Sequence, residues 1–163
     1  MGKRNFRRRT KQLILAVTAC LFGGPLFAQC NEAIVDLKGD WGQARFSVEI
    51  ADDPEEQARG LMFRETLPLS HGMLFLYESP RSVAFWMENT LIPLDMLFIG
   101  PDGRVARIHE NAIPKDRTVI NGGRGIQAVL EINGGLARKI GIEVGSAVRH
   151  PAFDPSGAAW PCD

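Results

Sequence analysis

The sequence has few of the features from which an activity is read directly. Among its 163 residues are three cysteines and three isolated histidines, with no second ligand at metal-binding spacing. It has no Gly-x-Ser-x-Gly turn, and no Lys-Ser or Lys-Thr pair follows the glycine-rich segment 122–125. The sequence therefore predicts no metal site, no cofactor and no phosphate-binding loop, and it offers no triad for nucleophilic catalysis.

A basic stripe of the kind that binds nucleic acid is also absent. The formal net charge is zero, but residues 1–28 contain six basic and no acidic side chains. The rest of the chain has 13 basic against 19 acidic residues, a formal charge of −6. Because recognition of a phosphate backbone needs clustered lysine and arginine, we expect no nucleic-acid partner.

No hydrophobic run is long enough to cross a membrane. The longest follows the basic N-terminus, from Leu13 to Phe22, and Gly23-Gly24-Pro25 interrupts it before the ~20 residues that a spanning helix needs. This order predicts a signal peptide over residues 1–28 and a periplasmic or secreted protein. A second processing route stays open, because Val17-Thr18-Ala19-Cys20 resembles a lipobox; membrane attachment would then occur through a lipid on Cys20.

Two cysteines remain after the expected signal. Cys30 lies near the start of the expected domain, residues 29–163, and Cys162 is the penultimate residue. An oxidising compartment favours a disulfide between them that ties both tails to the domain. The alternative is two free thiols.

Short β-strands dominate the pattern after residue 32. A helix is expected to start at Asp52-Asp53-Pro54 and to end before Pro68, and a second, single-turn helix over Leu136–Ile140. Residues 111–124 have the composition of an exposed loop. The pattern predicts one α+β domain, a small β-rich, curled or barrel-like sheet with one or two short helices. The expected strands are 33–38, 44–50, 73–77, 83–88, 94–99, 104–110, 125–133 and 146–149.

Several segments are similar to a family of bacterial and archaeal proteins, the domain of unknown function 192. The resemblance covers about residues 33–149 and implies a compact β-rich domain that is frequently exported, with no known activity. The matching segments are Gly60-Leu61-Met62-Phe63-Arg64, Gly72-Met73-Leu74-Phe75, residues 85–95 (FWMENTLIPLD), residues 129–135 (VLEINGG) and Gly141-Ile142-Glu143-Val144-Gly145.

The densest group of candidate binding residues is found near the end of the expected strand 83–88. Asn89, Thr90 and Asp95 offer an amide, a hydroxyl and a carboxylate beside the aromatic side chain of Trp86. Arg64 adds a guanidinium that can bind a carboxylate. In the alternative interpretation these residues are structural: Asn89 and Thr90 close turns, Trp86 belongs to the core, and Asp95 pairs with Arg64.

Three functions follow from these patterns. The preferred one is an exported, non-catalytic domain that binds a small polar ligand or a protein partner of the cell envelope through residues 86–95. A hydrolase or lyase that uses Asp95 or Glu88 as general acid or base is the second. The third is a structural accessory protein whose tails are joined by the two cysteines.

Overall fold

A computed structural model of the chain describes Gly2 and residues 30–162. The signal peptide predicted over residues 1–28, Gly2 apart, and the lipobox cysteine Cys20 lie outside the described residues. Within residues 30–162, no helix has the length and apolar character that a membrane span requires.

The domain is built on one sheet of seven strands, in the order β5-β4-β6-β3-β2-β1-β7. All neighbouring strands are antiparallel except β2 and β3, which are parallel. The elements are β1 (Ile34–Gly39), β2 (Gly42–Ala51), α1 (Pro54–Arg59), β3 (His71–Phe85), β4 (Leu94–Ile99), β5 (Val105–Ala112), β6 (Ile120–Asn133), α2 (Leu136–Ile140) and β7 (Ala147–Arg149).

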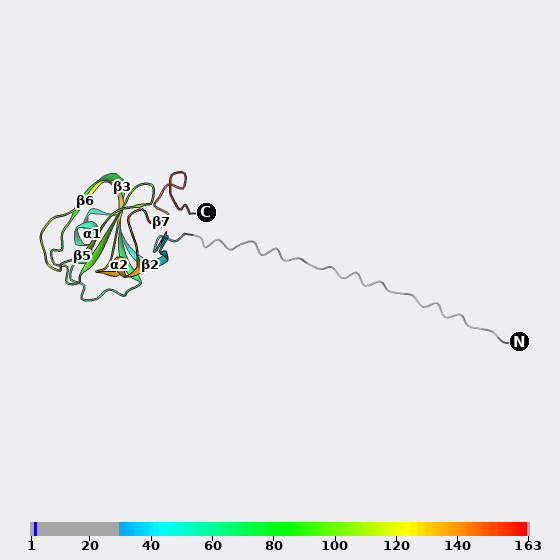
Figure 1. Cartoon of the computed structure of the whole chain (residues 1–163), viewed down its shortest axis with the longest axis horizontal. Coiled ribbons are helices and arrows are strands. Elements are labelled where there is room, and N and C mark those ends of the chain that lie inside the picture. Colours follow the sequence, from blue (N-terminus) through cyan, green and yellow to red (C-terminus); the bar gives the residue numbers. More distant parts are fainter. Residues whose placement is uncertain (1, 3–29, 163) are drawn as a thin grey trace.

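The sheet is strongly curled (Figure 1), and its two outermost strands, β5 and β7, are connected at one point. Arg104, just before β5, forms a bridge with Ala147 of β7, and the amide of Val105 donates to the carbonyl of Ser146 at 3.0 Å. The result is a half-barrel with two short helices, which confirms the predicted fold class.

Each face of the sheet packs against its own apolar core, because side chains alternate along a strand. Along β4, Leu97 and Ile99 belong to a first core, which also contains the start of α2. Met96 and Phe98 belong to a second core on the opposite face.

Three predicted boundaries are wrong. Strand β3 is continuous from His71 to Phe85, where the sequence predicted separate strands 73–77 and 83–88 with the latter running past Phe85. Strand β6 begins at Ile120, inside the segment 111–124 that was predicted to be a loop. These errors have one cause: the parts of β3 and β6 concerned pair with each other through several register shifts. Such long-range pairing is not visible in local composition.

Helix α1 is also shorter than predicted. Its start is as expected: the Asp53 carboxylate accepts hydrogen bonds from the amides of Glu55 and Glu56 at 2.8 and 2.9 Å. The helix ends at Arg59, because Gly60 adopts φ 49°. A Cβ at this glycine would lie 3.2 Å from the Phe75 ring, so the chain turns here in close contact with β3.

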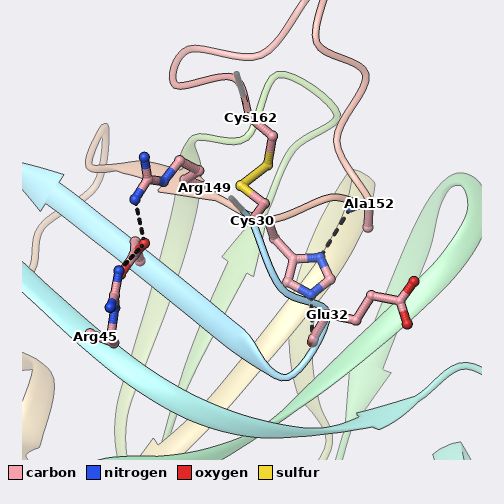
Figure 2. Close-up of a disulfide and its surroundings, with 8 residues drawn as sticks. Cys30, Glu32, Arg45, Arg149, Ala152 and Cys162 are labelled. Atoms are coloured by element: carbon pink, nitrogen blue, oxygen red, sulfur yellow. Dashed lines mark hydrogen bonds and ion pairs between the residues drawn. A yellow bond between two sulfur atoms is a disulfide. The ribbon is translucent and has the colours of Figure 1, made fainter. Parts of the chain in front are cut away.

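The two ends of the described domain are joined beside β1 and β7. The sulfur atoms of Cys30 and Cys162 form a disulfide, with the Cα atoms 5.7 Å apart (Figure 2), as the sequence predicted. Nearby, Asp36 of β1 accepts hydrogen bonds from Arg45 at 2.6 Å and Arg149 at 2.7 Å. Burial raises the pKa of Asp36, but the two guanidinium groups outweigh it and hold the pKa below its usual value.

Candidate functional site

A pocket of about 410 Å³ opens on the side of the second core. Its walls come from α1 and the turn after it, from both halves of β3, and from the segment that follows β3. Its one contribution from β6 is Glu131. We call this cavity the Glu131 pocket.

Helix α1 is held against the sheet as one wall of the Glu131 pocket. The side-chain amide of Gln57 donates to the carbonyl oxygen of Leu76 in β3 at 2.8 Å and to that of Ala51, at the end of β2, at 3.3 Å. Leu61, in the turn after the helix, is 2% exposed and belongs to the second core. The wall is therefore fixed by both polar and apolar contacts, which is typical of a preformed binding site.

Glu131 is a buried carboxyl group in apolar surroundings. It lies near the C-terminal end of β6, paired with Met73 of β3 on one side and Met96 of β4 on the other. Directly paired residues project from the same face of a sheet, so its side chain lies among residues of the second core, and it is 4% exposed.

Burial raises the pKa of Glu131 from 4.5 to about 8, and no hydrogen bond or ion pair with residues 30–162 offsets this effect. At neutral pH the group is therefore mainly a neutral carboxylic acid. A perturbed, unpartnered carboxyl that lines a cavity is the usual physical mark of a functional site.

Tyr77 and Arg81 of β3 face the same cavity. Burial, together with the negative charge of Glu131 when it ionises, raises the pKa of Tyr77 to about 12, while Arg81 lowers it. The Arg81 guanidinium lies over the Tyr77 ring, 5.5 Å from its centroid. The charges of the guanidinium and the carboxyl therefore both influence the pKa of the phenol.

Two of the five predicted binding residues line the Glu131 pocket. Trp86 is 51% exposed, so it is not a core residue, and its ring forms part of the pocket wall. Thr90 also lines the pocket and is 5% exposed. Its hydroxyl lies 3.4 Å from the carbonyl oxygen of Glu88, a long hydrogen bond that leaves the hydroxyl able to accept from a ligand.

Arg64 and Asn89 lie outside the Glu131 pocket. Arg64 forms a two-pronged ion pair with Glu49 at 2.6 and 2.5 Å, and not the pair with Asp95 that the structural alternative expected. Asn89 adopts φ 56° and its carbonyl oxygen accepts from the Phe63 amide at 2.9 Å. Asn89 lines a separate pocket of about 460 Å³ with Glu88, whose carboxylate is paired with Arg117 at 2.6 Å.

Asp95 is fully buried on the opposite face of the sheet. Its carboxylate accepts hydrogen bonds from the amides of Asn111 at 2.7 Å, Gly135 at 2.8 Å and Ala137 at 2.7 Å. It thereby fixes the end of β5 and the first turn of α2. This geometry gives Asp95 a structural role. Its position does not support the prediction that it contacts a ligand.

Glu131 was not among the residues selected from the sequence, although one signal pointed to it. It is the single charged residue in the run Ala128-Val129-Leu130-Glu131-Ile132. A charged group inside a continuous apolar strand is either paired or functional. The absence of a partner for it could be learned only from the tertiary structure.

Within residues 30–162, no group of three or more His, Cys, Asp or Glu side chains is arranged to hold a metal ion. The Glu131 pocket contains a single carboxyl, with Arg59 and Arg81 as its charged neighbours. These groups can form hydrogen bonds and charge interactions.

A protein-family model matches residues 35–150, which is most of the described domain. The chain belongs to the DUF192 family. The family is described as an uncharacterized ACR, and the match confirms the resemblance seen over residues 33–149. No curated protein matches the chain.

Two solved structures are similar to this DUF192 domain. One is a protein of unknown function from Novosphingobium aromaticivorans DSM 12444, with 47% sequence identity and a TM-score of 0.69, over 71% of this chain and 82% of that one. The other is a "putative transcription regulator" from Sinorhizobium meliloti 1021, with 36% identity and a TM-score of 0.72, over 77% of this chain and 98% of that one.

Proposed function

We propose that this DUF192 domain binds a small organic molecule in the Glu131 pocket, in the periplasm or outside the cell. One observation carries the proposal: a carboxyl group that is 4% exposed, without a partner among residues 30–162, lines a cavity of about 410 Å³. Leaving such a group unpaired costs stability, and a ligand that pairs with it recovers the cost.

The walls are of mixed character, and their aromatic side chains support a ligand with an apolar body. Phe75, Tyr77, Phe85 and Trp86 all line the Glu131 pocket, and Phe75 packs edge-on against Phe85 with ring centroids 5.1 Å apart. Aromatic walls with a few convergent polar groups are typical of small-molecule sites. Trp86 and Thr90 bring part of the predicted segment 86–95 into this site.

The N-terminal segment and the disulfide support the proposal that the protein is exported. Residues 1–28 have the order of a signal peptide. The disulfide between Cys30 and Cys162 is a bond that persists in oxidising compartments. Mass spectrometry of the protein recovered from the periplasm should find the chain cut near Ala28 and the cysteines oxidised. A full-length, reduced protein in the cytosol would contradict this part.

A role on DNA receives no support from the charge distribution. The protein from Sinorhizobium meliloti is named as a regulator of transcription, but residues 29–163 of this chain have a formal charge of −6. Binding to a phosphate backbone depends on clustered positive charge.

The test uses neutral fragments, so that binding in the pocket is measured without a contribution from ligand charge. Indole and cyclohexanone are titrated into the isotope-labelled full-length protein, and amide shifts are followed by NMR. We expect saturable shifts at Tyr77, Thr90 and Glu131. Shifts confined to other surfaces would refute the proposal.

A pair of variants makes this test specific. Ala58→Phe places a ring in the pocket from an exposed position on α1 and should weaken fragment binding at least tenfold. Ala106→Phe adds the same ring at an exposed position on β5, outside the pocket, and should leave binding unchanged. Equal effects of the two substitutions would contradict the assignment.

Glu131 also favours a second candidate function, that of an enzyme with this residue as general acid. The predicted acid-base residues Glu88 and Asp95 do not line the Glu131 pocket, whereas Glu131 has the raised pKa that such a role requires. Turnover of any pocket ligand that Glu131→Gln abolishes, with binding retained, would select this function over binding alone.

A further inference from the structure

The two ends of the Glu131 pocket differ in charge. Arg59 and Arg81 are both exposed and both line the pocket, so their guanidinium groups lie at its mouth. Neither forms an ion pair with a residue in 30–162, whereas other arginines do so with Glu49, Glu88, Glu110 and Asp36. The mouth thus offers two cations without a neutralising carboxylate.

The inner end offers hydrogen-bond donors and little negative charge. Glu131 is buried between Met73 and Met96, and ionisation of a carboxyl in such surroundings is unfavourable. As a neutral acid it has one O–H donor. Tyr77, which also lines the pocket and whose ring lies beneath the Arg81 guanidinium, has a phenol that is a second donor.

From this asymmetry we infer that the Glu131 pocket selects an amphiphilic organic anion. Its negative group lies between Arg59 and Arg81 at the mouth, its apolar body contacts the aromatic walls, and an oxygen acceptor near its inner end receives a hydrogen bond from Glu131 or Tyr77. The inference rests on the proposed function and adds the chemical class of the ligand.

A cationic ligand fits the same pocket poorly. An amine would have to pass two guanidinium groups, and to form an ion pair it would first have to ionise Glu131 in an apolar environment. A neutral acceptor requires no change of protonation. An anion at the mouth gains charge-assisted hydrogen bonds that are still partly solvated, and these survive in moderate salt.

Three probes of matched length separate these possibilities. γ-Benzoylbutyrate has a carboxylate and a ketone, δ-phenylvalerate has the carboxylate alone, and phenylpentylamine has an ammonium in its place. Calorimetry on the full-length protein at pH 7 should give the tightest binding for γ-benzoylbutyrate. We expect a loss of about 3- to 10-fold for δ-phenylvalerate, the range of one net hydrogen bond, and a further loss for phenylpentylamine.

Variants assign each contact. Arg59→Gln with Arg81→Gln should weaken both acids about tenfold and leave phenylpentylamine unchanged or tighter. Arg107→Gln with Lys139→Gln removes two exposed positive charges outside the pocket and should have no such effect. Glu131→Leu combined with Tyr77→Phe should abolish the preference for the ketone, whereas Glu131→Gln, which keeps a donor, should retain part of it.

The outcomes separate a wrong ligand class from a wrong proposed function. If indole and cyclohexanone bind in the pocket but phenylpentylamine binds as tightly as the acids, or none of the three probes binds, the inferred ligand class is wrong and the pocket remains a binding site. If neither the neutral fragments nor the anions bind, the proposed function fails as well.

Discussion

Two buried acids on opposite faces of the sheet have opposite surroundings. Asp95 of β4 pairs with Ile132 of β6, and the next residue along β4, Met96, pairs with Glu131. Asp95 receives three backbone hydrogen bonds, while Glu131 receives none from residues 30–162. The acid on the face of the first core therefore holds the fold, whereas the acid on the face of the second core is left unpaired among residues 30–162.

The largest effect should come from removing the satisfied acid. Asp95→Ala leaves three buried amides without an acceptor, and we expect a loss of about 4 kcal/mol in the free energy of unfolding. Urea denaturation followed by circular dichroism measures it. Asp95→Asn keeps one acceptor oxygen and should lose about half as much. A loss below about 1 kcal/mol for Asp95→Ala would remove the contrast between the two faces.

Replacing Glu131, the acid without a partner among residues 30–162, should raise the free energy of unfolding. Burial keeps the pKa of Glu131 at about 8 against 4.5, so between these pH values the folded protein holds a proton that the unfolded chain loses. Its contribution to stability is complete below pH 4.5 and decreases as the pH rises to about 8. At pH 8, Glu131→Gln should therefore be more stable than the wild type, by on the order of 3 kcal/mol.

The measurement is a comparison of urea denaturation at pH 5 and pH 8. Wild type should lose stability between the two, and Glu131→Gln should lose less. Glu143→Gln, at an exposed position after α2, is the matched control and should follow the wild type. A Glu131→Gln protein that is less stable than the wild type at pH 8 would show that the carboxyl has a stabilising partner.

The smallest effect on stability is expected at the pocket wall. Trp86 is 51% exposed, so Trp86→Ala should change the free energy of unfolding by no more than about 0.5 kcal/mol. The affinity of the Trp86→Ala protein for indole should nevertheless fall about fivefold, because an aromatic contact is lost. Val144→Ala, a truncation at a side chain that is 61% exposed elsewhere, should change neither quantity. Unchanged indole affinity in Trp86→Ala would exclude the ring from the site.

The curled sheet and the two short helices could be predicted from the sequence because alternation and turn residues are local signals. The continuity of β3 could not, since Glu78-Ser79-Pro80 reads as a turn. In the structure these residues lie within β3, where the pairing with β6 shifts between Leu76 and Arg81. The exposure of Trp86 follows from the end of that strand at Phe85.

The candidate site was predicted in part for the same reason. The segment after β3 gathers polar and aromatic residues in sequence, and Trp86 and Thr90 line the Glu131 pocket. Asp95 belongs to a strand whose alternation directs it to the other face. Glu131 is 41 residues from Thr90 along the chain, and its pocket exists only because β6 pairs with β3 beneath α1.

The most direct test is the titration of Glu131 itself. The carboxyl carbon resonance is followed by NMR between pH 4 and pH 10 in the full-length protein, and assigned by its absence in Glu131→Gln. The account predicts a midpoint near 8 that shifts upward when γ-benzoylbutyrate is bound, since the ligand favours the protonated form. A midpoint near 4.5, the ordinary value, unmoved by any ligand, would contradict it.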